Sequence, residues 1–214
     1  MGDHHQHEHE HEHEHSDVPG ELALRAKALQ SLLVEKGIVD EAMIDRVIEA
    51  NEHRYGPHLG AAVVARAWVD PAFKSALLAD GTSAVNQMGL PTRVDARLVA
   101  LENTDEVHNL VVCTLCSCYP GTLLGLPPVW YKSAPYRSRA VLEPRSVLAE
   151  FGTEVDDELE VRVWDSNSEV RYLVVPQRPE GTEGWSEEQL AELVTRNAMI
   201  GVERAQRPGE VAVS

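Results

Sequence analysis

The chain has 214 residues and a hydrophobic share of 43%, which suits one hydrophobic core. Its formal net charge of −16 at pH 7 disfavours binding of nucleic acid, because phosphates need basic partners. No run approaches the roughly 20 apolar residues that span a bilayer, and no basic start leads into an apolar run. We therefore expect a cytoplasmic protein that binds neither nucleic acid nor membrane.

The first 17 residues, MGDHHQHEHEHEHEHSD, are of low complexity and hold seven of the ten histidines. Such a segment lacks the apolar residues for a core, so residues 1–20 are expected to form a disordered His/Glu-rich tail. It is either an added purification tag or a natural tail that loosely collects divalent metal. Neither interpretation makes it a catalytic site.

Helical patterns follow the tail. Apolar residues recur at helical spacing over residues 21–37, and a second such segment covers residues 40–56. A third helix is expected over residues 70–81, because an aspartate suited to the N-cap is followed there by proline. These segments predict a helical N-terminal arm over residues 21–85.

Further along the chain the pattern changes to strands. Four runs are expected to form them: residues 96–104, 107–115, 158–165 and 169–177. A short turn joins the last two, so we expect them to pair as a hairpin. Pro144 opens a short helix, and a capping box of Ser186 and Gln189 opens one helix over residues 186–201. This order predicts an α+β fold, in which the arm precedes a layered α-β-β-α domain over residues 86–214.

All the cysteines of the chain lie in one stretch, VVCTLCSCYP, as Cys113, Cys116 and Cys118. Three thiols cannot pair completely, and the cytosol disfavours disulfides, so a chemical role is expected. One interpretation is a zinc site. Its fourth ligand would be a carboxylate or one of three distant histidines, His53, His58 and His108.

The spacing of Cys116, Ser117 and Cys118 indicates a different site. Two thiolates that hold one metal draw the backbone nitrogens of Ser117 and Cys118 beside it, in unstrained chelate rings. Two thiolates and two deprotonated amides form a square plane, which Cys113 closes from below while one position stays open for catalysis. Such strong-field donors suit low-spin trivalent iron or cobalt rather than zinc.

The stretch VCTLCSCYP resembles the metal claw of the nitrile hydratase α subunit, and Thr114 is similar to the cobalt type, since the iron type has serine there. The resemblance covers residues 21–203. It also rests on other segments: LLADGT, LENTDEVHNLVV, LGLPP, WYKSAPYRSR, EVRVWDS, PQRPEGTEGWSEEQLAELVTR and MIGV.

The resemblance implies an enzyme that hydrates a nitrile to an amide at Co(III), with iron as the less favoured metal. It implies that Cys113 stays a thiolate, Cys116 becomes a sulfinic acid and Cys118 a sulfenic acid, with amide nitrogens from Ser117 and Cys118. The metal polarises the nitrile, and either the Cys118 sulfenate oxygen or a water attacks it. Arginines of a β subunit grip the oxidised cysteines, so a hetero-oligomer is expected.

Two other functions stay open from the sequence. A thiocyanate hydrolase subunit uses the same claw on a different small substrate. A non-catalytic zinc module would instead hold metal through the cysteines and gather it through the His/Glu tail.

Charged side chains near the claw are candidates for supporting roles. Asp165 and Glu169 occupy the place where similar proteins carry an acidic pair, although a polar turn between strands would look the same. Arg137 and Arg139 are expected either to pair with acids across an interface or to form a solvated edge. The tryptophans are expected to pack in the interior: Trp68, Trp130, Trp164 and Trp185.

The chain departs from the family pattern after the claw. The family usually has Pro-Trp-Pro there, whereas Gly121 and Thr122 follow Pro120 in this chain. Loss of an indole leaves space, so Tyr119, Gly121 and Thr122 are candidate walls of a wide substrate pocket. This favours a bulky aromatic or heteroaromatic nitrile, as in toyocamycin nitrile hydratase. The family's Gln-Gly before LENT is also missing from GLPTRVDAR.

Overall fold

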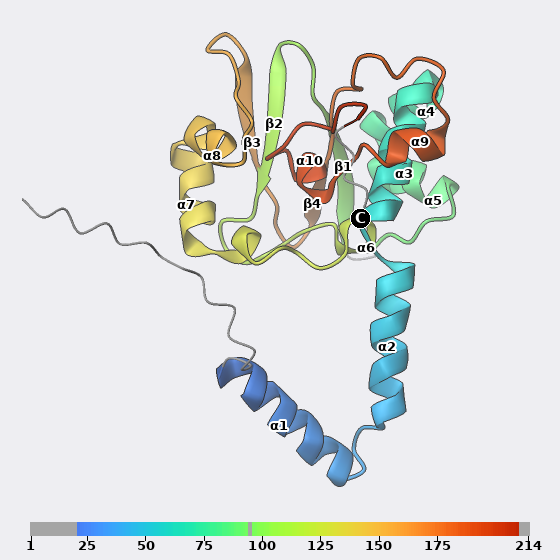
Figure 1. Cartoon of the computed structure of the whole chain (residues 1–214), viewed down its shortest axis with the longest axis vertical. Coiled ribbons are helices and arrows are strands. Elements are labelled where there is room, and N and C mark those ends of the chain that lie inside the picture. Colours follow the sequence, from blue (N-terminus) through green and yellow to red (C-terminus); the bar gives the residue numbers. More distant parts are fainter. Residues whose placement is uncertain (1–20, 94–95, 210–214) are drawn as a thin grey trace, which may run out of the picture. The chain divides into compact units, whose positions relative to one another are not determined.

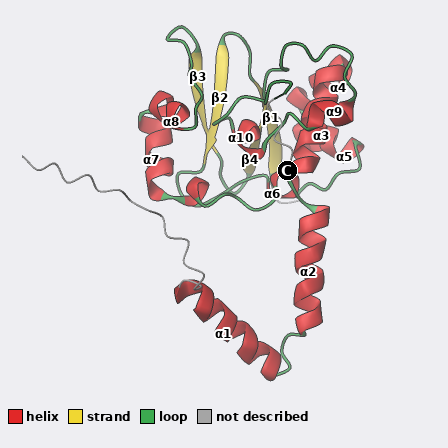
Figure 2. Ribbon diagram, viewed as in Figure 1, coloured by secondary structure: helices red, strands yellow, loops and turns green. Residues whose placement is uncertain are grey.

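The computed structural model describes residues 21–93 and 96–209, and the chain divides into two compact units, Met1–Ile48 and Glu49–Ser214. The expected tail over residues 1–20 lies outside the described residues. No helix in the described ranges is both long and apolar enough to cross a membrane. Figures 1 and 2 show the helices and strands.

Two helices lie at the start of the described chain, α1 (Glu21–Glu35) and α2 (Glu41–Arg54). Gly37 adopts a φ of 64° just beyond α1, and the amide of Ile38 returns to the Leu33 carbonyl at 2.9 Å, which ends the helix. The Asp40 carboxylate accepts the Ala42 amide at 3.1 Å and so opens α2. Both helices therefore follow the sequence prediction.

Three further helices belong to the second unit: α3 (Pro57–Val69), α4 (Pro71–Ala79) and α5 (Gly81–Gln87). Asp70 caps α4 as expected, by accepting the amides of Ala72 and Phe73 at 3.0 Å. Both α4 and α5 pack against the first strand. The compact units therefore divide at Ile48, not at residue 85, because these helices share the core of the strands.

The four strands are β1 (Arg97–Glu102), β2 (Val107–Val112), β3 (Glu160–Asp165) and β4 (Val170–Val175). They form two sheets of parallel pairs, β1 with β4 and β2 with β3. The predicted hairpin of the last two strands is therefore wrong. After β1 and again after β3 the chain crosses to the other sheet, so neither strand pairs with the strand that follows it.

Polar side chains shape the two crossings. Thr104 Oγ1 accepts the amides of Glu106 and Val107 at 3.2 and 3.1 Å, and the Asn167 side chain accepts those of Glu169 and Val170 at 2.9 and 3.0 Å. These bonds satisfy backbone amides within the turns, so neither turn depends on hydrogen bonds between the two strands that it joins.

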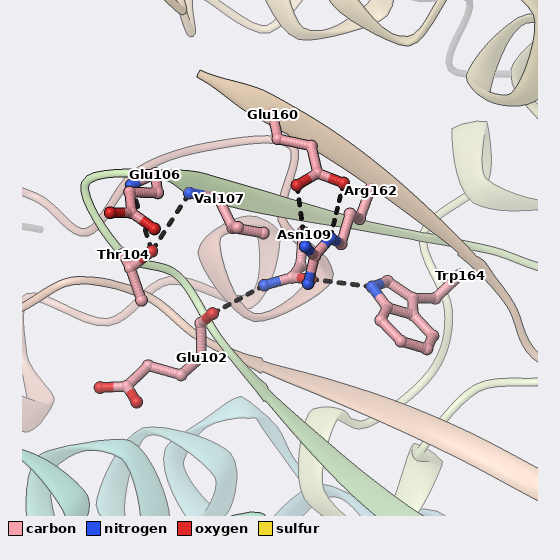
Figure 3. A network of polar contacts seen from close by, with 8 residues as sticks. All are labelled: Glu102, Thr104, Glu106, Val107, Asn109, Glu160, Arg162 and Trp164. Atoms are coloured by element: carbon pink, nitrogen blue, oxygen red, sulfur yellow. Dashed lines mark hydrogen bonds and ion pairs between the residues drawn. The ribbon is translucent and has the colours of Figure 1, made fainter. Parts of the chain in front are cut away.

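Asn109 links three of the strands (Figure 3). Its Nδ2 donates to the Glu102 carbonyl of β1 at 2.8 Å, and its Oδ1 accepts Trp164 Nε1 of β3 at 2.8 Å. Asn109 is itself buried in β2. Because a buried amide needs hydrogen-bond partners, these bonds fix how the two sheets meet. They also hold Trp164, the residue immediately before Asp165 in the chain, in place.

Later helices of the chain lie against the strands (Figure 1). Helices α7 (Ala134–Leu142) and α8 (Pro144–Glu150) contact β2 and β3, respectively, while α10 (Arg196–Ile200) packs on β4. The short α6 (Gly121–Leu124) and a 3-10 turn at Trp130–Lys132 precede α7. The α+β fold class is confirmed.

The expected single helix over residues 186–201 is wrong. The structure has α9 (Glu187–Ala191) and α10, because the Thr195 hydroxyl accepts the Ala198 amide at 3.0 Å and starts a new helix. The predicted capping box of Ser186 and Gln189 does open α9.

All four tryptophans pack against core clusters as expected: Trp68, Trp130, Trp164 and Trp185.

Candidate metal centre

The three cysteines meet in the loop that follows β2. The Sγ atoms of Cys113 and Cys116 are 3.4 Å apart, those of Cys116 and Cys118 are 3.2 Å apart, and all three lie within 4.8 Å of one another. None forms a disulfide. This is the one such cluster of His, Cys, Asp and Glu within the described ranges, and its donor set fits a single thiophilic ion.

The three thiols differ in exposure and acidity. Cys113 is buried, Cys118 is half-buried and Cys116 is exposed. Hydrogen bonds from the Cys118 and Cys113 thiols lower the pKa of Cys116 to about 7, whereas burial, followed by the bond to Cys116, raises the pKa of Cys118 to about 12. Cys116 is therefore the first of these two thiols to become a thiolate, the form that binds metal and reacts with oxidants.

The described histidines of the zinc interpretation do not join the cluster. His108 is buried and its Nε2 contacts the Gly201 carbonyl at 2.7 Å, while burial lowers its pKa. His58 lies in the wall of a neighbouring pocket. The side chain of His53 is outside the described residues. A fourth ligand from one of the described histidines therefore finds no support.

Asp165 holds the cysteine loop from β3. Its Oδ1 accepts the Thr114 amide at 2.9 Å and its Oδ2 accepts the Thr114 hydroxyl at 2.6 Å. Asp165 is paired with Val112 in the parallel sheet, and both residues end their strands. The parallel register therefore places this carboxylate directly beside the start of the loop.

Two buried tyrosines hold the cysteine loop and the end of β2 that leads into it. Tyr131 donates to the Cys118 carbonyl at 2.9 Å, and Tyr136 donates to the Val111 carbonyl at 2.7 Å. Burial raises the pKa of both phenols, so they stay neutral donors. Sequence reasoning missed these two residues. The signal that could have found them is the segment WYKSAPYRSR, which contains both tyrosines.

Glu169 lies apart from the cysteine loop. Its exposed side chain lines a separate hollow of about 500 Å³ together with Asp80 and Arg97. Its backbone carbonyl accepts the Arg97 amide at 2.7 Å. The structure therefore brings Asp165 to the loop but gives Glu169 no contact with it.

Arg137 and Arg139 make contacts within the chain. Arg137 Nη1 donates to the carbonyl of Leu115 in the cysteine loop at 3.3 Å. Arg139 forms ion pairs with Glu143 at 2.7 Å and Glu150 at 2.5 Å. Arg137 is therefore a further support of the loop, and the charge of Arg139 is already balanced.

A pocket of about 660 Å³ opens beside the loop. Its walls include Ser117 and the three predicted substrate-pocket residues: Tyr119, Gly121 and Thr122. A Cβ atom added at Gly121 meets nothing within 4 Å, so this wall is recessed. The Tyr119 hydroxyl donates to the Leu124 carbonyl at 3.2 Å, and burial raises its pKa while the nearby charge of Arg196 opposes that rise.

Comparisons with known proteins fit this geometry. The family model "Nitrile hydratase, alpha chain" matches residues 20–203. The chain belongs to this family. It is 56% identical over 191 residues to the cobalt-containing nitrile hydratase subunit alpha of Pseudonocardia thermophila. The matched region covers 89% of this chain and 94% of that relative.

The chain is also similar to an iron-type nitrile hydratase and to a thiocyanate hydrolase subunit. The structure of an Fe-type nitrile hydratase double mutant from Comamonas testosteroni Ni1 matches with a TM-score of 0.80 at 42% identity, over 87% of this chain and 91% of that one. The thiocyanate hydrolase subunit gamma of Thiobacillus thioparus is 44% identical, over 85% of this chain and 79% of the relative.

Proposed function

We propose that the chain is the α subunit of a cobalt nitrile hydratase, which adds water to a nitrile and releases the amide. The cluster of three thiols, held by Asp165 through Thr114, is the observation that carries this proposal. The cobalt-containing relative at 56% identity supports the choice of metal.

The chain's own residues define the ligand set. Cys113, Cys116 and Cys118 would supply sulfur, and the backbones of Ser117 and Cys118 would supply two amide nitrogens. When bound as Co(III), the metal supplies Lewis acidity toward the nitrile. The buried Cys113 would bind the metal from the interior of the protein, whereas the exposed Cys116 would bind it on the side that faces solvent.

Exposure and acidity support the proposed oxidation pattern. Oxidation of these cysteines, with molecular oxygen as the oxidant, follows thiolate character and access, and Cys116 has both, which fits the two oxygens of a sulfinic acid. Cys118 is less exposed and is proposed to take one oxygen as a sulfenic acid, while the buried Cys113 stays a thiolate. The Cys118 sulfenate oxygen, or a water beside it, is the proposed nucleophile.

Apolar surface around the site supports a β partner. Leu115, Leu126 and Val129 are 86%, 83% and 83% exposed, although large aliphatic side chains gain free energy from burial. Arginines from such a partner would reach the oxidised cysteines. Three cysteines that lie together in one loop without a disulfide also fit a cytoplasmic enzyme.

One purified sample tests these assignments together. We expect one cobalt per α chain, a copurifying second subunit, and a Val111–Pro120 peptide with two oxygens on Cys116, one on Cys118 and none on Cys113. Metal analysis and peptide mass spectrometry measure this. Stoichiometric zinc with three plain thiols in active protein, or full turnover by a lone monomer, contradicts the proposal.

The recessed wall at Gly121 predicts a bulky substrate. We expect aromatic or heteroaromatic nitriles, such as the nucleoside nitrile toyocamycin, to exceed acrylonitrile in kcat/KM by about tenfold, since unfilled space forfeits dispersion contacts. Gly121→Trp should lower kcat/KM for benzonitrile and spare acrylonitrile. Because a side chain at residue 121 meets open space, the variant should fold normally. Gly121→Ala is the matched control. Equal losses on both substrates refute the recessed-wall idea.

A thiocyanate hydrolase activity is the second candidate, favoured by the 44% identical gamma subunit. Turnover of thiocyanate with no turnover of any nitrile would establish it instead.

A further inference from the structure

Arg196 gives the pocket beside the cysteine loop a positive charge at its wall. It is the first residue of α10, and its half-buried side chain lines the same pocket as Ser117. No Asp or Glu is found among the described residues that line this pocket, although the chain as a whole carries a net charge of −16. The pocket is therefore basic within an acidic protein.

The guanidinium of Arg196 is incompletely satisfied. Its Nη1 donates to the Leu126 carbonyl at 3.1 Å, whereas its Nε is buried without a hydrogen-bond partner. No ion pair of Arg196 is found within the described ranges, in contrast to Arg66, Arg139 and Arg162. A partly buried cation without a carboxylate is costly, so a ligand that supplies negative charge would be stabilised here.

Arg196 is an arginine of the wall whose guanidinium carries an unpartnered nitrogen. Arg93 also lines the pocket but already has an interaction within the chain. Arg196 lines the same pocket as Tyr119, the residue that follows Cys118. One pocket therefore joins a cationic wall to the proposed metal loop, and its volume of about 660 Å³ is large enough for an aromatic ring with a polar substituent.

We propose that Arg196 determines specificity by binding a carboxylate on the substrate, so that the preferred nitriles are aromatic nitriles that also carry a carboxylate group. This inference rests on the proposed nitrile hydration. The planar guanidinium fork matches a carboxylate better than it matches a neutral amide, and charge-assisted bonds of this kind are about twice as strong as neutral ones.

The test uses the assembled cobalt enzyme and two substrates of nearly equal shape, 3-cyanobenzoate and 3-cyanobenzamide. We expect kcat/KM to favour the carboxylate by about tenfold, equivalent to about 1.4 kcal/mol. In Arg196→Gln this ratio should fall to about one, and Arg196→Lys, which keeps the charge but loses the fork, should give an intermediate ratio. Cobalt content is measured for each variant, so that the ratios are compared at equal loading.

Arg162→Gln is the matched control, because Arg162 is an exposed arginine of β3 whose partner is Glu160, at 2.8 Å. It removes the same charge outside the pocket and should leave the ratio unchanged. Competitive inhibition of the unaltered enzyme by benzoate and benzamide gives a measurement that needs no variant, and benzoate should bind about tenfold more tightly.

Equal kcat/KM values for the two nitriles, together with equal inhibition by benzoate and benzamide, overturn the assignment of Arg196. So does a ratio that Arg162→Gln changes as much as Arg196→Gln does. In either case continued hydration of 3-cyanobenzamide leaves the proposed function intact. Absence of turnover on both nitriles and on benzonitrile would instead contradict the proposed function itself.

Discussion

Cys118→Ser is expected to lower kcat/KM by about 10³-fold or more, because it removes a proposed metal ligand and its proposed sulfenate oxygen, whereas loss of a residue that only orients a ligand typically costs about 10- to 100-fold. A serine hydroxyl is a poor ligand for cobalt and cannot become a sulfenic acid. The half-buried position and the small change in volume argue against unfolding. Steady-state kinetics and cobalt analysis on the same assembled sample measure the effect.

Ser117→Ala separates the side chain from the backbone. The proposed ligand at this residue is its amide nitrogen, so the alanine variant should retain one cobalt per chain. Loss of cobalt from Ser117→Ala would show that the hydroxyl is needed. Cys118→Ser that keeps both cobalt and turnover would remove Cys118 from the ligand set.

Asp165→Ala is expected to lower cobalt content or kcat/KM by about 10- to 100-fold, the usual effect of removing a group that orients a metal site. The change removes both bonds to Thr114, at 2.9 and 2.6 Å. Thr114→Val keeps the shape and the amide bond but loses the hydroxyl bond, so its effect should be smaller.

A substitution elsewhere controls for charge. Asp157→Ala removes an exposed carboxylate from the turn before β3 and should leave cobalt content and kcat/KM unchanged. Thermal unfolding of each variant checks that the fold is retained. If Asp165→Ala binds cobalt and turns over nitrile as well as Asp157→Ala does, the bonds to Thr114 have no role in the site.

The cysteine loop was predictable because its proposed metal ligands lie close together in sequence. Cys113, Cys116 and Cys118 need only local backbone geometry to meet, so their spacing already restricts the metal. The residues that support the loop are distant along the chain, and Tyr131 and Tyr136 reach it only through packing of the helical turn and α7. Arg196 is likewise brought to the pocket by the start of α10, which no local pattern indicates.

The strands show the same division between local and distant information. Alternation and β-branched residues located all four segments, but they do not encode which strands pair. The four residues between β3 and β4 are compatible with a hairpin, and the pairing was decided by contacts such as that of Trp164 with Asn109. The break at Thr195 was missed because apolar spacing continues across it, while a threonine hydroxyl can restart a helix.

The parallel pairing of the strands has a consequence for when cobalt can be inserted. Arg97 lies opposite Val170, and Thr114 is held by Asp165, 51 positions later in the chain. Contacts of such high sequence separation form slowly and require both segments to be present. During translation the cysteine stretch therefore leaves the ribosome before β3 and β4, the strands that come after it in the chain. Cobalt loading should then follow synthesis of the chain through Val175, the last residue of β4.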